Sequence, residues 1–151
     1  MDEGYRELIE RLFDAFNRRD PEVIVAVCHE EMEFYAVTAE EVGRSDPYRG
    51  SEGLRAYLDD VATVWEELLI TPNEIEQRED SLLVRGRVYL RSREHGIRDM
   101  PTAWIWDVID DRFIRGQAFI NPEEAVRSFS REARPEPSPD SGASRSMTQR
   151  P

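Results

Sequence analysis

Acid–base chemistry in this chain would fall to a carboxylate, because the sequence has 32 Asp and Glu residues but only two histidines. A carboxylate works as a general acid or base near neutral pH when an apolar wall partly desolvates it and raises its pKa. Asp99 meets this condition best, since it stands beside Met100 and Pro101 and shortly before Trp104. We therefore name Asp99 as the candidate catalytic residue; a solvated surface charge is the alternative interpretation.

Aromatic residues supply the candidate binding surface. In the segment 99–109, Trp104 and Trp106 alternate with Ala103 and Ile105, which places both indole rings on one face of a strand. Small residues on the following strand would leave open space beneath these rings for a flat apolar ligand, whereas filling a core is the alternative. Tyr57 adds a hydroxyl that could orient a carbonyl group or a water molecule. The candidate ligand-binding residues are Phe34, Tyr57, Trp65, Trp104, Trp106 and Ala118.

Other kinds of site lack a sequence signature. His29 falls at the end of a predicted helix and His95 in an EHG turn, so both are expected to be solvated. The sequence has no HExxH or CxxC motif, and its GSEG segment at 50–53 lacks the lysine of a phosphate-binding loop. We expect no metal ion and no cofactor.

Charge argues against two classes of partner. The formal net charge of -12 would repel nucleic-acid phosphates and anionic membrane surfaces, so neither is an expected partner. Cys28 is the single cysteine, which excludes an intrachain disulfide and indicates a small buried hydrophobe. The N-terminal run MDEGYRELIERLF is acidic and amphipathic, unlike a signal peptide, so the prediction is a cytoplasmic protein.

Periodicity predicts an ordered series of helices and strands followed by a tail. The expected helices are 3–18, 21–29, 51–68 with Ser51 as N-cap, and 122–129; the expected strands are 32–37, 70–78, 82–93, 99–109 and 112–120. Residues 1–130 then form one domain, and residues 131–151, rich in proline and serine, are predicted to be disordered.

Short links between the last four strands predict a mainly antiparallel sheet in an α+β domain. We expect a cone-shaped, curved sheet that wraps the long third helix, follows two N-terminal helices and leaves a hollow. Both faces of the segment 99–109 are apolar. Because an apolar sheet face needs a cover, we also expect a homodimer formed through the second face.

Three segments together resemble a known family. FNRRDPEVIVAVCHEEMEF, YRGSEGLRAYL and AWIWDVIDDRFIRGQAFINPEEAV resemble, in order and spacing, the SnoaL-like branch of the nuclear-transport-factor-2-like superfamily over residues 5–129. The resemblance implies that fold, and polyketide cyclases of this branch use one carboxylate as acid and base. The residues that ketosteroid isomerase uses fall on Leu12, Ala36 and Trp104, so that constellation is absent.

Two functions remain in competition, because this fold carries many activities. The first is the binding of a small, largely apolar molecule in an enclosed pocket, with or without cyclase-, isomerase- or hydrolase-type chemistry by a carboxylate. The second is a non-catalytic module that dimerises or binds another protein.

Overall fold

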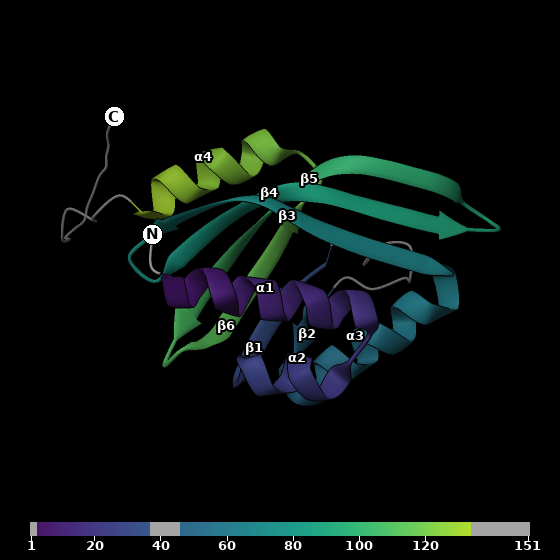
Figure 1. Cartoon of the computed structure of the whole chain (residues 1–151), viewed down its shortest axis with the longest axis horizontal. Helices are drawn as coiled ribbons and strands as arrows, with labels where there is room; N and C mark the ends of the chain where they lie inside the picture. The colour runs from purple at the N-terminus through teal and green to yellow at the C-terminus, as the bar shows by residue number, and fades with distance from the viewer. Residues whose placement is uncertain (1–2, 37–45, 134–151) are drawn as a thin grey trace.

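The structure of the chain is a computed structural model that describes residues 3–36 and 46–133. Its elements, in chain order (Figure 1), are α1 (Glu3–Arg18), α2 (Pro21–Val27), β1 (Cys28–Tyr35), β2 (Tyr48–Arg49), α3 (Gly50–Val64), β3 (Glu67–Arg78), β4 (Ser81–Ser92), β5 (Gly96–Ile109), β6 (Arg112–Phe119) and α4 (Pro122–Ala133).

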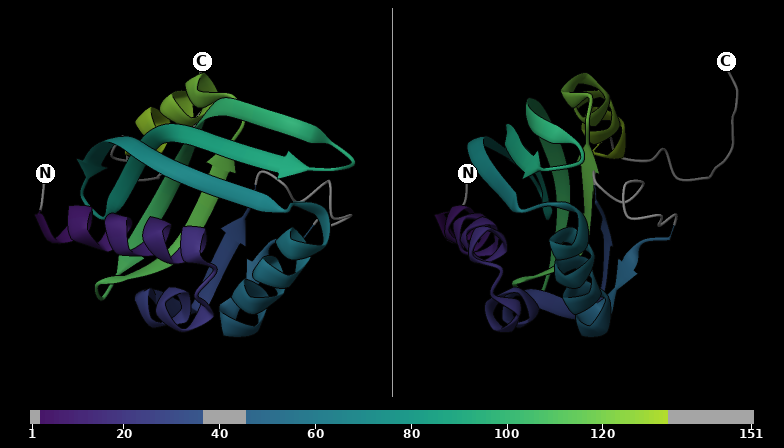
Figure 2. Two further views of the ribbon diagram at one scale, coloured as in Figure 1. Left: turned by 45° about the vertical axis from the view of Figure 1, so that its right-hand side comes forward. Right: turned by 90° about the vertical axis from the view of Figure 1, so that its right-hand side faces the viewer.

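One curved sheet of six strands organises the domain, in the order β2-β1-β6-β5-β4-β3. β1 and β6 are parallel, and the other neighbours are antiparallel. Figure 2 shows the sheet curling over α1, α2 and α3, with α4 on its opposite side. The predicted α+β architecture with a curved mixed sheet is confirmed. On the inner face, α1 packs along the edge strand β3 and reaches Trp104 and Trp106 of β5 through Phe13, while α3 packs against β1 and β2.

The bend of the sheet is built into the pairing of β3 with β4. The register shifts between Pro72 and Glu74, opposite Gly86 and Arg85, so β3 has one extra residue there. Such a bulge bends a strand and increases its twist. Gly86 permits the close approach, because a Cβ atom at this position would lie 1.8 Å from the carbonyl oxygen of Thr71.

Asn17 joins α1 to the edge strand β3. Its Nδ2 donates to the Ile70 carbonyl oxygen at 2.9 Å, and the Ile70 amide donates to Asn17 Oδ1 at 2.7 Å. The Asn17 side chain therefore satisfies the backbone N–H and C=O of Ile70. On a free sheet edge these groups could otherwise pair with a further strand. This contact also fixes Ile70 beside the C-terminal end of α1.

Two separate apolar clusters lie on the two faces of the sheet. The inner cluster holds most of the core, including Trp104, Trp106 and the buried face of α1. The outer cluster contains Leu83, Ala103, Ile105, Ala125 and Phe129. The last two residues of that cluster belong to α4, so this helix covers the second apolar face of β5.

The cover formed by α4 removes the reason for which a second subunit was expected at these residues. The alternation of Trp104 and Trp106 with Ala103 and Ile105 is confirmed, but the chain itself buries the second face. Dimerisation through the sheet remains a prediction.

Several element boundaries differ from the sequence-based expectation. α3 ends at Val64 because Trp65 adopts extended dihedrals, φ -113° and ψ 124°, after a β-branched stretch. Arg49, not Ser51, is the N-cap of α3, since the helix starts one residue before the serine. β1 begins at Cys28, directly after α2, and the two-residue strand β2 was not expected.

A bulge in β6 changes which of its residues face the core. Asp107 pairs with Arg115 but Val108 pairs with Phe113, so Ile114 is an extra residue on β6. Phe113 is consequently buried in the inner cluster, although strict alternation from Gly116 would have placed Ile114 there.

The last helix starts where it was expected and extends further. Asn121 Oδ1 accepts a hydrogen bond from the Glu123 amide at 3.0 Å and so caps the start of the helix. The helix continues to Ala133, three residues past the predicted domain boundary at 130. The remainder of the predicted tail, residues 134–151, lies outside the described residues. Among the helices of residues 3–36 and 46–133, none is long and apolar enough to span a membrane.

Candidate functional site

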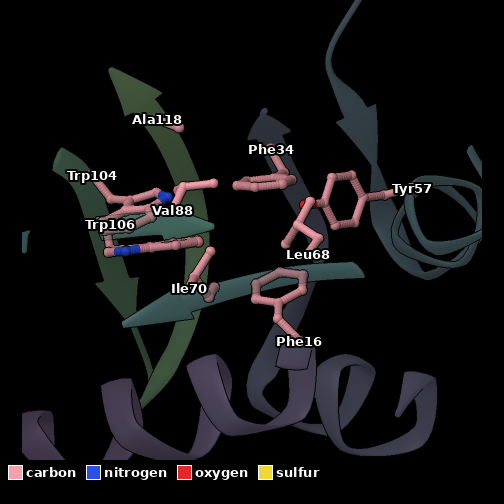
Figure 3. Close-up of a pocket in the computed structure, with 9 residues that line it drawn as sticks. All are labelled: Phe16, Phe34, Tyr57, Leu68, Ile70, Val88, Trp104, Trp106 and Ala118. Atoms are coloured by element: carbon pink, nitrogen blue, oxygen red, sulfur yellow. The ribbon is translucent and has the colours of Figure 1, made fainter. Parts of the chain in front are cut away.

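A small apolar cavity lies between the inner face of the sheet and the helices (Figure 3). Its volume is about 20 Å³, which is room for roughly one water molecule. The lining residues are Phe16, Phe34, Tyr57, Leu68, Ile70, Val88, Trp104, Trp106 and Ala118. They come from α1, α3 and every strand except β2, so seven elements of the fold meet at this point.

Strand register brings the lining residues of the sheet together. Trp104 lies opposite Ala118, and Ile70 lies opposite Val88. Phe34 of β1 and Trp106 of β5 both lie opposite Gly116, on its two sides. The sequence-based candidates Phe34, Tyr57, Trp104, Trp106 and Ala118 therefore do share one cavity.

The open space that was expected beneath the two indole rings is largely filled, because the Trp106 ring lies directly over Gly116. A Cβ atom on Gly116 would lie 2.2 Å from ring atom Cζ3 of Trp106. The same ring stacks on Phe34, with 5.6 Å between centroids and an interplanar angle of 6°. Gly116 thus serves the packing of Trp106, and only the small cavity lined by the residues of Figure 3 remains open.

Tyr57 places a hydroxyl at the cavity. The side chain is only 7% exposed, and burial raises the pKa of its phenol, while the positive charge of Arg19 partly opposes that rise. None of the hydrogen bonds found among the described residues uses this hydroxyl. Figure 3 shows it pointing from α3 towards Phe34 and Leu68.

Asp99 does not lie in the cavity. Its side chain is 56% exposed on the outer face of β5, where Oδ1 accepts a hydrogen bond from Arg87 Nε at 3.0 Å. Its neighbour Met100 is the residue that packs against the inner core, as does Trp104, which has the same parity along the strand. In the part of the chain that the structure describes, no carboxylate belongs to the cavity lining, and Asp99 does not lie where the proposed acid–base chemistry requires it.

Replacing Asp99 is expected to have little effect. Asp99→Asn should change the free energy of unfolding by no more than about 1 kcal/mol, because exposed ion pairs contribute little. It should also leave the binding of any ligand in the cavity unchanged. Urea denaturation and ligand titration of the variant beside the wild type test both statements. A tenfold loss of ligand affinity in the variant would show that Asp99 does take part in binding.

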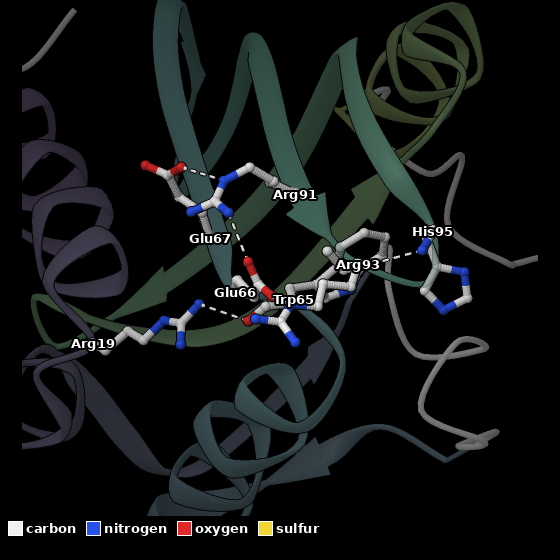
Figure 4. Close-up of polar contacts among 8 residues, drawn as sticks. Arg19, Trp65, Glu66, Glu67, Arg91, Arg93 and His95 are labelled. Carbon is white, nitrogen blue, oxygen red and sulfur yellow. Dashed lines mark hydrogen bonds and ion pairs between the residues drawn. The ribbon is translucent and has the colours of Figure 1, made fainter.

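Trp65 also lies outside the cavity lining, next to the β4–β5 turn (Figure 4). The ring is fully buried, with the Arg98 guanidinium 5.3 Å from its centroid and the His95 ring at the same distance. Its Nε1 atom has no hydrogen-bond partner among the described residues. The following residue, Glu66, accepts a hydrogen bond from Arg91 Nη1 at 2.6 Å. Trp65 thus packs beside the β4–β5 turn and not in the cavity. It was expected on the same helical face as Tyr57, but α3 ends at Val64, before Trp65.

Four lining residues were not among the sequence-based candidates: Phe16, Leu68, Ile70 and Val88. Phe16 could have been found from the apolar face of α1. The strand residues required the register of β3 with β4, which pairs Ile70 with Val88 and which alternation alone does not give.

No metal-binding arrangement is present in the described part of the chain, where no group of three or more His, Cys, Asp and Glu side chains could hold an ion. Burial raises the pKa of the Cys28 thiol to about 12, so this residue stays protonated and packs as a small hydrophobe.

Comparison with known proteins agrees with the fold. The profile of the SnoaL-like domain matches residues 9–116. TerC, crystallised with polyporic acid, has 20% sequence identity and a TM-score of 0.71, over 86% of this chain and 98% of TerC. A nuclear-transport-factor-2-like protein of unknown function from Burkholderia pseudomallei has 16% identity and a TM-score of 0.71, over 84% of this chain and 97% of its own.

A third solved structure also contains a small molecule. It is a hypothetical protein with a ketosteroid isomerase-like fold from Catenulispora acidiphila, in complex with trimethylamine. Its identity is 10% and its TM-score 0.65, over 75% of this chain and 84% of its own. None of the curated proteins matches this chain in sequence. At these identities the solved structures support the fold alone.

Proposed function

Because the chain belongs to the SnoaL-like domain family, we propose that it binds a small, largely apolar molecule in the cavity between Tyr57, Trp104 and Ala118. The observation that carries this proposal is the convergence of seven elements on one apolar cavity that contains a hydroxyl. TerC and the Catenulispora acidiphila protein, which share the fold, were crystallised with small molecules.

The cavity has to open for a ligand to enter. Sites for small organic molecules usually have roughly 300 Å³ or more, against the 20 Å³ of this cavity. Leu68, Ile70 and Val88 are aliphatic side chains with alternative rotamers, and Ala118 is partly exposed at the rim. Part of the binding free energy is then used to move side chains, so a modest affinity is expected.

Binding without carboxylate catalysis is the form of this function that the lining favours. Its described residues include no Asp, Glu or His, and the buried phenol of Tyr57 stays protonated near neutral pH. A SnoaL-like cyclase reaction through Asp99 would need that carboxylate at the cavity, whereas it pairs with Arg87 on the other face.

A pair of variants on β6 tests the proposal. Ala118→Phe puts a ring into the rim of the cavity, whereas Gln117→Phe puts the same ring on the opposite face of the same strand. We expect 1-indanone, observed by ligand-detected NMR with the full chain, to bind the wild type and Gln117→Phe. Ala118→Phe should weaken binding at least tenfold while its melting temperature changes by only a few degrees.

Two results would contradict the proposal. If 1-indanone and related bicyclic aromatic compounds give no binding signal with the wild type at millimolar concentration, the cavity is a packing defect. If Ala118→Phe and Gln117→Phe bind equally well, the ligand occupies another place.

The small volume of the cavity favours one second candidate, a non-catalytic module that binds another protein or a second copy of itself. Leu69 and Ile97, which are 38% and 65% exposed, lie on the outer face of the long hairpins, outside the cover formed by α4. Under this alternative, light scattering of the same wild-type sample would give a dimer mass, and no small molecule would bind.

A further inference from the structure

Each polar side-chain group that the described residues offer to the cavity can donate a hydrogen bond. Among the described residues, these groups are the Tyr57 hydroxyl, which can donate or accept, and the indole N–H groups of Trp104 and Trp106, which only donate. The Trp106 Nε1 atom is buried and has no partner among the described residues. Within residues 3–36 and 46–133, no side-chain carboxylate, amide or imidazole belongs to the lining, which leaves the Tyr57 oxygen as its one side-chain acceptor.

Neighbouring rings fix the direction of the Tyr57 hydroxyl. The rings of Phe16, Phe34 and Tyr48 meet the Tyr57 ring edge to face, at centroid distances of 5.5, 5.1 and 5.3 Å. With its ring held on several sides, Tyr57 cannot turn its hydroxyl to solvent without disturbing this cluster. The hydroxyl thus points towards Phe34 and Leu68 before any ligand arrives (Figure 3).

The surroundings of the hydroxyl favour donation over acceptance. Arg19 lies close enough for its positive charge to stabilise negative charge on the phenol oxygen. A nearby cation makes an O–H group a stronger donor and a weaker acceptor. Burial, which raises the pKa of the phenol, keeps the proton in place throughout the physiological range.

A water molecule would satisfy this hydroxyl poorly. Stable buried waters make about two to four hydrogen bonds, but most of the surfaces around this cavity are aliphatic or aromatic. A ligand atom that accepts one hydrogen bond and whose remainder is apolar would suit the site better.

We propose that the cavity is selective for a planar aromatic molecule bearing a hydrogen-bond acceptor, such as the carbonyl oxygen of an aryl ketone, which accepts from Tyr57. This proposal rests on the function proposed above, because it names the class of ligand for the same cavity. Tyr57 acts as a binding residue that orients the ligand by its acceptor atom.

The test compares two ligands of nearly equal shape on the full chain. 1-Indanone has a carbonyl group and indane does not, and both are titrated into the wild type, Tyr57→Phe and Tyr35→Phe by ligand-detected NMR. Tyr35 is the matched control, since its hydroxyl donates to Glu33 at 3.4 Å on the outer side of β1. Tyr57→Phe should weaken 1-indanone about two- to tenfold, the value of one net hydrogen bond, and leave indane unchanged. Tyr35→Phe should change neither affinity.

Each result decides between the two proposals. If indane binds and Tyr57→Phe leaves both affinities unchanged, selectivity for an acceptor is wrong and the pocket itself stands. If Tyr57→Phe weakens indane and 1-indanone equally, the residue serves packing only, and selectivity is again wrong. If neither compound binds any of the proteins, the proposed function fails and this inference fails with it. Thermal unfolding shows that each variant is folded, and Tyr57→Phe should be at least as stable as the wild type because it removes a buried hydroxyl.

Discussion

Gly86→Ala is expected to lower the free energy of unfolding by more than about 3 kcal/mol. The new Cβ atom would lie 1.8 Å from the Thr71 oxygen, 2.9 Å from the Thr71 carbonyl carbon and 3.1 Å from Pro72 Cα. All of these are backbone atoms, so no rotamer change relieves the clash. β3 and β4 must separate at their bulge, and urea denaturation followed by circular dichroism measures the loss.

Gly96→Ala is the matched control for this substitution. Gly96 has a φ of +73°, but nothing lies within 4 Å of the position of an added Cβ atom. The cost is therefore limited to a left-handed backbone conformation, about 1 kcal/mol. Equal losses for the two variants would show that glycine flexibility, and not the close approach of β3, explains the role of Gly86.

The same bulge affects the candidate site. Ile70 and Val88 face each other only two residues beyond the Pro72–Gly86 pair, and both line the cavity. A Gly86→Ala protein that remains folded should bind 1-indanone more weakly than the wild type, because its inner sheet face has moved. Gly86 thus contributes both to the close packing of β4 on β3 and to the position of two cavity residues.

Local patterns in the sequence were sufficient for much of the fold. The amphipathic spacing of α1, the Asp20-Pro21 start of α2 and the alternation around Trp104 and Trp106 depend on near neighbours, and the structure agrees with them. Asp20 Oδ1 accepts from the amides of Glu22 and Val23, at 3.1 and 3.4 Å, as the cap requires. Patterns of this kind are local in origin and can be seen in one sequence.

The features that the sequence did not predict depend on contacts between residues far apart in the chain. Asp99 belongs to the outer face because of its parity with Ala103, but its partner Arg87 becomes visible only with the β4–β5 register. The helix predicted at 122–129 was correct, whereas its docking on Leu83 and Ile105 was not foreseen. The volume of the cavity could not be predicted from the sequence. It depends on the position of the Trp106 ring over Gly116, which is set by the pairing of β5 with β6 and by the Phe34 ring.

Trp106→Ala should be about 3–5 kcal/mol less stable than the wild type, the usual cost of deleting a buried aromatic side chain. Trp106 is fully buried and packs against Phe34, Phe13 and Phe113, at centroid distances of 5.6, 6.0 and 5.3 Å. Its deletion leaves an indole-shaped space beside the existing cavity. Urea denaturation measures the loss, which Trp106→Phe should reduce by filling part of the space.

Free indole should restore part of that stability. The wild-type cavity of 20 Å³ does not admit indole without side-chain movement, whereas the variant offers a preformed space with apolar walls. Indole at ten times its dissociation constant would stabilise the variant by about 1.4 kcal/mol and the wild type by much less. Ile24→Ala, a deletion at a fully buried residue of α2 outside the cavity, is the control. If indole stabilises Ile24→Ala as much as Trp106→Ala, the compound acts nonspecifically; if it stabilises neither, the space closes on itself, and the inner face of this sheet cannot hold a ligand of that size.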